Sequence, residues 1–407
     1  MLRHASTRNT IAARAQDLFP GGLALPGVRA QVARIVARRL GATGRSHGPL
    51  QPDLTLWLCL AMALLRQRSI PDVFSRLLSA WRAQLPGIGL RDVTDGALAH
   101  ARDRLGPSPL CELFEALAAD ADTGPEFFGR RVWALDCTCL TMPDTPANDL
   151  GYGRQKSAKG RSAFPQAMAA TLVAVRTHEV RAASLLPFST PESWATLEFL
   201  QHLGAGDVVL LDRNFSGAWF LRQVQSTGAR FVARTSIVRR PKILARLAPG
   251  DFDVVVKPTH VDPLRPDKSP LVLRMVEYRV GGREPIRLLT NLPRESVHAR
   301  AVAGLYHERW EAEASYDELK THLLGASCGT LSTTFRGRSP RMVDQEFYAD
   351  LCLFNLLRRL LGTAARRSGI APRRIAFVAA LHVVGDSLAD VENVRPQDRL
   401  RLYQRIL

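Results

Sequence analysis

Several features that would assign a class of function are missing from this sequence. Its 407 residues include six scattered cysteines, so neither a disulfide framework nor a zinc site is expected. Only Cys137 and Cys139 are close, and a strand would place both side chains on one face as small packing residues. The longest apolar run, 54–65, is too short and too interrupted to span a membrane, and we expect no signal peptide. No G-x-x-x-x-G-K-[ST] loop is present, which leaves nucleotide hydrolysis without support.

Acidic residues are also few in comparison with basic residues. The chain has 55 Lys and Arg against 38 Asp and Glu, which gives a net charge of +17 and a pI near 10.5. An excess of this size, spread along the chain, favours a polyanionic partner, most simply nucleic acid. The alternative is a basic surface that keeps the protein soluble. The length is sufficient for two or three domains with a substantial core.

The first part of the chain, 1–122, is predicted to be helical. We expect a basic amphipathic helix at 28–40, an apolar helix that starts at Pro52, and a helix over 72–81 that follows Pro71. A further helix, GALAHARDRLG, has the capping residue Thr94 before it and Gly106 after it. Several short helices with a basic one among them indicate either a helix-turn-helix type DNA-binding domain or a plain helical bundle.

From residue 123 to 340 the pattern changes to alternating strands and helices. Strands are predicted at 131–140, 166–175, 180–186, 207–211 and 230–233, with helices from Pro191 and over 217–226. Three adjacent strands, then helix, strand, helix, strand, is the order of a ribonuclease-H-like α/β core. Residues from about 236 to 292 break this alternation, and we predict a β-rich insertion there, with strands at 252–257, 271–280 and 285–292. Residues 341–407 are predicted to form a helical C-terminal region.

Acidic side chains stand at two strand ends and on one helix of this core. Asp136 lies near the end of one predicted strand, and Asp212 directly follows another. Catalytic acids of α/β sheets gather at the carboxyl ends of strands. Glu313 lies in the predicted helix 306–320, on a stripe at helical spacing with Tyr306, Arg309, Trp310, Asp317 and Lys320. This stripe is either a solvated face or part of a site that handles anions. Because few carboxylates suffice to hold Mg²⁺, the three acids indicate a metal-dependent nuclease.

The spacing Y-x2-R-x3-E-x6-K, supplied here by Tyr306, Arg309, Glu313 and Lys320, resembles the signature of a large branch of bacterial insertion-sequence transposases of the DDE class. LDRNF at 211–215 resembles the second-aspartate motif of that family, and ALDCTCLTMPD at 134–144 resembles the first. The early helices and the 340–359 segment also resemble those proteins. The similarity therefore extends over roughly the whole chain, and four motifs agree with one another.

This resemblance implies a specific site. Asp136, Asp212 and Glu313 would be the catalytic metal ligands, with Asp136 bridging two Mg²⁺ ions (Mn²⁺ being an alternative). Tyr306, Arg309 and Lys320 would contact phosphates of the transposon end. Trp310 would be either a core residue, the preferred interpretation, or a platform for an unstacked base. Arg213 would pair with Asp212 or with a phosphate.

The resemblance also implies partners and a reaction. The protein would nick double-stranded DNA at the terminal inverted repeats, then join the 3′-OH to the opposite strand or to target DNA. It would act as a homodimer in the DNA complex, in the bacterial cytoplasm at the nucleoid. Two alternatives remain, namely a catalytically silent transposase-derived DNA-binding protein and a nuclease without strand transfer.

Overall fold

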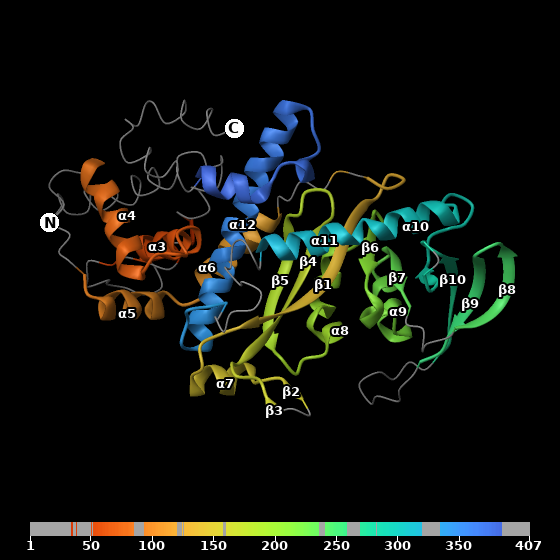
Figure 1. Cartoon of the computed structure of the whole chain (residues 1–407), viewed down its shortest axis with the longest axis horizontal. Helices are drawn as coiled ribbons and strands as arrows, with labels where there is room; N and C mark the ends of the chain where they lie inside the picture. Colours follow the sequence, from red (N-terminus) through yellow and green to blue (C-terminus); the bar gives the residue numbers. More distant parts are fainter. Residues whose placement is uncertain are drawn as a thin grey trace. The chain divides into compact units, whose positions relative to one another are not determined.

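The computed structural model describes most of the chain (Figure 1). The described residues are 34, 35, 38, 50, 52–84, 93–119, 124, 126–157, 160–235, 241–258, 269–281, 283–319 and 334–384. The helix predicted at 28–40 falls almost wholly outside them. None of the helices within these ranges is long and apolar enough to cross a membrane.

The chain divides into two compact units, each built from separate segments. One unit comprises Ala121–Cys139 and Ala167–Tyr316, and the other comprises Met1–Asp120, Leu140–Gln166 and Asp317–Leu407. The strands of the first unit's sheet are β1 (Arg131–Thr141), β4 (Gln166–Ala174), β5 (Val180–Pro187), β6 (Asp207–Leu211), β7 (Arg230–Arg234), β8 (Lys242–Ala248), β9 (Asp251–Val256), β10 (Leu271–Tyr278) and β11 (Ile286–Thr290). Its helical segments are α8 (Glu192–Ala195), η1 (Leu197–His202), η2 (Arg213–Phe215), α9 (Ala218–Ser226), α10 (Ala299–His307) and α11 (Arg309–Asp317).

All nine of these strands belong to one sheet, in the order β5-β4-β1-β6-β7-β11-β10-β9-β8. Strand β6 pairs in parallel with β1 on one side and with β7 on the other. The five strands predicted for the α/β core are therefore confirmed, with bounds within about one residue of those expected.

The predicted β insertion is present, but it does not form a module apart from the core sheet. Strand β11 pairs antiparallel with β7, and β10, β9 and β8 continue the same sheet through antiparallel pairs. Strand β8 was not predicted from the sequence, and its side chains are mostly exposed. An edge strand that buries little apolar surface carries only a weak hydrophobic pattern, which explains why it was missed.

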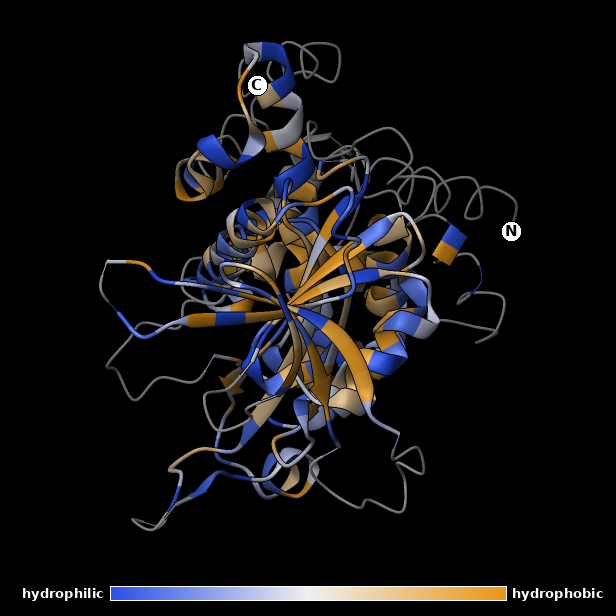
Figure 2. Ribbon diagram, turned by 90° about the vertical axis from the view of Figure 1, so that its right-hand side faces the viewer, coloured by the Kyte–Doolittle hydropathy of each residue, from blue (hydrophilic) through white to orange (hydrophobic). Residues whose placement is uncertain are grey.

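The two faces of the sheet bury different helices because side chains alternate along each strand. On one face, Val209 and Leu211 of β6 join a cluster with residues of α8, η1 and α9. On the other face, Val208 and Leu210 join a cluster that includes Val302, Leu305 and Tyr306 of α10. The strands are largely orange in Figure 2, which shows the apolar composition expected of a sheet covered on both faces.

The other unit is mostly helical. It contains α3 (Pro52–Leu64), α4 (Ile70–Gln84), α5 (Asp95–Leu105), α6 (Ser108–Ala119), α7 (Pro146–Tyr152), the short strands β2 (Lys156–Ser157) and β3 (Gly160–Arg161), α12 (Pro340–Ser368) and η4 (Pro372–Arg374). Thr94 caps α5 by accepting a hydrogen bond from the Ala97 backbone N–H, and Gly106 ends it at φ 68°, as predicted. Helix α12 packs against α3 and α6, and buried Arg102 of α5 pairs with Glu346 of α12 at 3.0 Å.

Candidate active site

Strands β1 and β6 bring two aspartates to the same edge of the sheet. The two strands are parallel neighbours, and Leu135 lies opposite Leu211 at the end of their paired register. The next residue in each case is an aspartate, Asp136 or Asp212. The predicted proximity of these two carboxylates is thus a direct consequence of the strand register.

Asp136 occupies a poorly solvated position at this edge. Its side chain is 21% exposed, and its Oδ1 accepts a hydrogen bond of 2.8 Å from the Cys137 backbone N–H. Burial raises the pKa of Asp136 to about 6. The Cys137 N–H and the positive charge of Arg309 oppose this increase, whereas the negative charges of Asp212 and Glu192 reinforce it.

Asp212 lies at the start of η2, which turns the chain away from the end of β6. Its Oδ1 accepts a hydrogen bond of 2.7 Å from the Asn214 backbone N–H, which caps this short segment. Arg213 is exposed, and among the described residues no ion pair joins it to Asp212. The phosphate contact considered for Arg213 stays a prediction.

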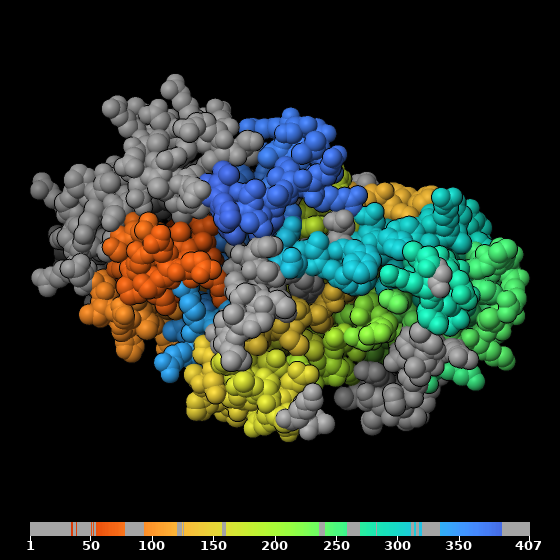
Figure 3. Space-filling view, viewed as in Figure 1, coloured from red at the N-terminus to blue at the C-terminus, as the bar shows by residue number. Residues whose placement is uncertain are grey.

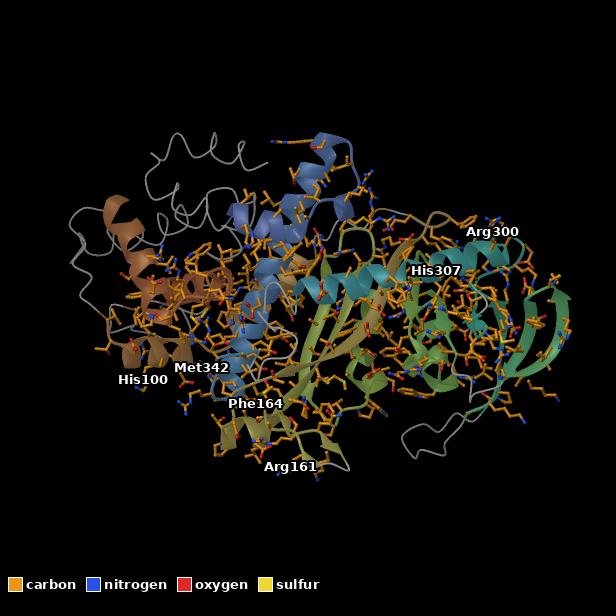
Figure 4. The ribbon with its side chains drawn as sticks, viewed as in Figure 1. His100, Arg161, Phe164, Arg300, His307 and Met342 are labelled. Atoms are coloured by element: carbon orange, nitrogen blue, oxygen red, sulfur yellow. The ribbon has the colours of Figure 1, made fainter. Side chains whose placement is uncertain are left out.

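The single helix predicted for 306–320 is two helices in the structure. Helix α10 ends at His307, and α11 begins at Arg309. Between them, the Glu308 backbone N–H bonds the Leu305 carbonyl at 3.0 Å, a tight i→i−3 turn in place of the α-helical bond. Figure 4 labels Arg300 and His307, which are exposed residues near the two ends of α10.

The side chains that the sequence placed on one stripe therefore belong to two helices. Tyr306 belongs to α10, and its side chain is buried in the core against the sheet. Trp310 belongs to α11 and is 63% exposed. The preferred interpretation of Trp310 as a core residue is therefore wrong, because α11 turns this ring toward solvent. Both helices form part of the surface in the space-filling view (Figure 3).

Arg309 joins the carboxylates of two different elements. Its Nη2 lies 2.5 Å from Glu313 Oε1, one turn further along α11, and its Nη1 lies 3.8 Å from Asp136 Oδ2. Asp136 lies in the middle of β1, which continues to Thr141, and not near the strand end as predicted. The guanidinium also stands over the Tyr306 ring, at 5.8 Å from its centroid. Burial alone would lower the pKa of Arg309, but Tyr306, Glu313 and Asp136 outweigh burial and raise it above its usual value. The i,i+4 pair considered from the sequence is present, and Asp136 is an additional partner of the same cation.

Lys320 lies outside the described residues, so its predicted phosphate contact has no counterpart here. Within the described ranges, no three His, Cys, Asp or Glu side chains are grouped closely enough to hold a metal ion. The chemistry of the donors nevertheless fits a hard divalent ion, since Asp136, Asp212 and Glu313 offer only carboxylate oxygens.

Glu192 is a fourth carboxylate near this edge, and sequence reasoning did not select it. It opens α8, the short helix that packs against η2 next to Asp212. Burial raises the pKa of Glu192, the charge of Asp212 adds to the increase, and a hydrogen bond from Asn214 opposes it. The only indication in the sequence was that Glu192 is an acidic residue in the first turn of the helix predicted after Pro191. Acidic residues are common at that position in any helix, so this feature did not distinguish Glu192 as a site residue.

The raised pKa of Asp136 predicts that Asp136→Asn stabilises the folded chain at high pH. Folded Asp136 has a pKa of about 6 against the ordinary 3.8. The folded state therefore keeps this proton to a higher pH than the unfolded state does. The free energy of unfolding decreases as pH rises from about 4 to about 6, and it stays lower above about pH 6. Asparagine carries no charge, so we expect the free energy of unfolding to increase by about 3 kcal/mol at pH 8 and to change little at pH 4.

Urea unfolding of both proteins at the two pH values measures this difference. Glu198→Gln, at an exposed carboxylate of the same unit, is the matched control and should change stability by less than about 0.5 kcal/mol at either pH. A loss of stability in Asp136→Asn at pH 8 would contradict the prediction.

Comparisons with known proteins agree with one another. Residues 29–115 match the family described as insertion element 4 transposase N-terminal, and residues 127–335 match the family described as transposase DDE domain. The chain is 24% identical over 356 residues to the transposase InsG for insertion sequence element IS4 of Escherichia coli (strain K12), across 84% of this chain and 77% of that protein. A cryo-EM structure of the piggyBac transposase synaptic complex with hairpin DNA is similar with a TM-score of 0.47 and 10% identity, over 97% of this chain and 85% of that one.

Proposed function

Since this chain belongs to the family of transposases with a DDE domain, we propose that it nicks and joins the ends of an insertion sequence with Asp136, Asp212 and Glu313 as its metal ligands. The observation that carries the proposal is the geometry around β1 and β6. Their paired register ends at two adjacent aspartates, and Arg309 links one of these to Glu313. Three carboxylates from three elements thus belong to one compact unit.

In this proposal, Asp136, Asp212 and Glu313 would hold two Mg²⁺ ions between them. The ions, for which Mn²⁺ can substitute, would activate the attacking oxygen and stabilise the leaving oxygen of a phosphodiester. The chain itself fixes the donors: the Cys137 N–H orients Asp136, and the Asn214 N–H orients Asp212. Attack by water breaks the P–O bond and leaves a 3′ hydroxyl. That hydroxyl then attacks either the opposite strand or target DNA.

Contacts to the DNA backbone are proposed for the residues around α11. Arg309 can donate charge-assisted hydrogen bonds to a phosphate, and its guanidinium lies over the Tyr306 ring. Lys320 completes the Tyr-Arg-Glu-Lys signature and supplies a further charge. Exposed Trp310 suits a stacking platform for an unstacked base, and exposed Arg213 suits a phosphate contact.

We also propose a ribonuclease-H-like core, which the order β5-β4-β1-β6-β7 supports. The proposed domains are a DNA-binding region at 1–122, a catalytic region at 123–340 and a helical C-terminal region at 341–407. Two copies would act together on terminal inverted repeats and target DNA, at the nucleoid in the bacterial cytoplasm. Two ends must be cut and joined in one event, which is the reason for a dimer.

The test is cleavage of a labelled transposon-end duplex with Mg²⁺ by the wild type and by Asp136→Ala. The end sequence is taken from the DNA that flanks the coding region. Nicking by the wild type and none by Asp136→Ala would support the proposal. If both proteins bind the duplex and neither nicks it, the catalytically silent alternative holds. Nicking without any joined product would favour a nuclease without strand transfer.

A further inference from the structure

The contacts of Arg309 have a consequence beyond phosphate binding. Its guanidinium spans the oxygens of Asp136 and Glu313, at 3.8 Å and 2.5 Å, and both carboxylates are proposed metal ligands. The Arg309 side chain is only 12% exposed, whereas that of Glu313 is 40% exposed. The cation is thus inserted among the ligands and does not lie over them from the solvent side.

A guanidinium in this position opposes the binding of a divalent ion to the same oxygens. An ion held by Asp136 and Glu313 would lie within a few ångströms of the Arg309 charge, where like charges repel strongly in a partly buried site. Glu313 Oε1 cannot both accept from Nη2 and bind an ion without sharing its negative charge, and Asp136 Oδ2 already faces Nη1. Arg309 and the ion are therefore competitors.

A DNA phosphate is the group that can relieve this competition. A phosphate matches the planar guanidinium as well as a carboxylate does. The Nε of Arg309 is buried and has no hydrogen-bond acceptor among the described residues, so a donor remains for a new partner. Arg309 is also the first residue of α11, immediately after the turn at Glu308. At a helix end, its side chain has room to change rotamer and exchange the two carboxylates for a phosphate.

We propose that Arg309 takes the place of a divalent ion between Asp136 and Glu313 in the DNA-free protein and moves to a phosphate when DNA binds. Ion binding then depends on DNA, so the ligands are assembled only on a substrate. This role rests on the proposed function, because it requires Asp136 and Glu313 to be metal ligands.

The experiment measures Mn²⁺ binding to the full chain by electron paramagnetic resonance, without DNA and with a random-sequence duplex, after subtraction of Mn²⁺ bound by the duplex alone. Wild type should bind Mn²⁺ at least about tenfold more tightly with DNA, within the usual range for coupled sites. Arg309→Met removes the charge but keeps much of the side-chain length. It should bind Mn²⁺ about tenfold more tightly than wild type without DNA, with little further gain from DNA.

Three controls separate the possible causes. Arg309→Lys keeps the charge and should resemble wild type, and Arg300→Met, at an exposed residue of α10, should leave Mn²⁺ binding unchanged. By reciprocity, Mn²⁺ should strengthen duplex binding by wild type by the same factor, which tests the coupling without any variant. Equal Mn²⁺ affinity of wild type with and without DNA would overturn the role of Arg309 and leave the metal site intact. Mn²⁺ binding that persists in Asp136→Asn and Glu313→Gln would instead overturn the proposed ligands.

Discussion

Glu313→Gln is expected to reduce cleavage of the transposon end by at least about a thousandfold, since the loss of an ion ligand removes several kcal/mol of transition-state stabilisation. Measured without divalent ions, affinity for the end duplex should stay within about threefold of wild type, because glutamine alters one side chain and no phosphate contact. The side-chain carbonyl of glutamine can still accept from Arg309 Nη2, so the start of α11 should keep its geometry. Electrophoretic mobility shift and nicking assays on the same labelled duplex measure the two quantities.

The control for this variant is Glu295→Gln, at an exposed glutamate of the same unit. It removes the same charge by the same chemical change and should leave both binding and cleavage near their wild-type values. A folded Glu313→Gln protein that lost binding and cleavage in equal measure would show that Glu313 supports DNA contacts and is not a ligand.

DNA affinity should decrease steeply with salt concentration. The net charge of +17 and a series of phosphate contacts predict the release of counterions from the duplex when the protein binds. For 6–10 phosphate contacts, affinity falls about 10³- to 10⁵-fold between about 50 and 200 mM salt. Fluorescence anisotropy with a labelled duplex over that range gives the slope of log affinity against log salt concentration.

A variant that lacks one phosphate contact should show a smaller dependence of DNA affinity on salt. Arg309→Met should reduce the magnitude of the slope by about one, because one phosphate contact is lost. Asp103→Asn, at an exposed acidic residue, should leave the slope unchanged. If wild-type affinity were indifferent to salt, neither the basic charge of the chain nor the proposed phosphate contacts could be responsible for binding.

Local patterns in the sequence determined the elements that carry the two aspartates. DVVLL predicted strand β6 over the same five residues that the structure assigns, because a short apolar run between turn signals indicates a buried strand. Thr94 and Gly106 set the ends of α5 through hydrogen bonds and dihedral angles of neighbouring residues. The same local signals placed Asp212 directly after a strand, whereas Asp136, expected near a strand end, lies in the middle of β1.

Tertiary structure alone decided how these elements combine. The strands after β7 join the core sheet through the pairing of β11 with β7. The sequence could not predict this, because these two strands are far apart in the chain and their pairing leaves no mark on local periodicity. The turn at Glu308 divides the predicted helix, with Tyr306 buried before it and Trp310 exposed after it, while Arg309 stays in contact with the Tyr306 ring. The partnership of Arg309 with Asp136 and the approach of Glu192 to Asp212 depend on that packing. Sequence spacing indicates which side chains can lie on one helical face, whereas charge pairs between elements form only when the folded chain brings those elements together.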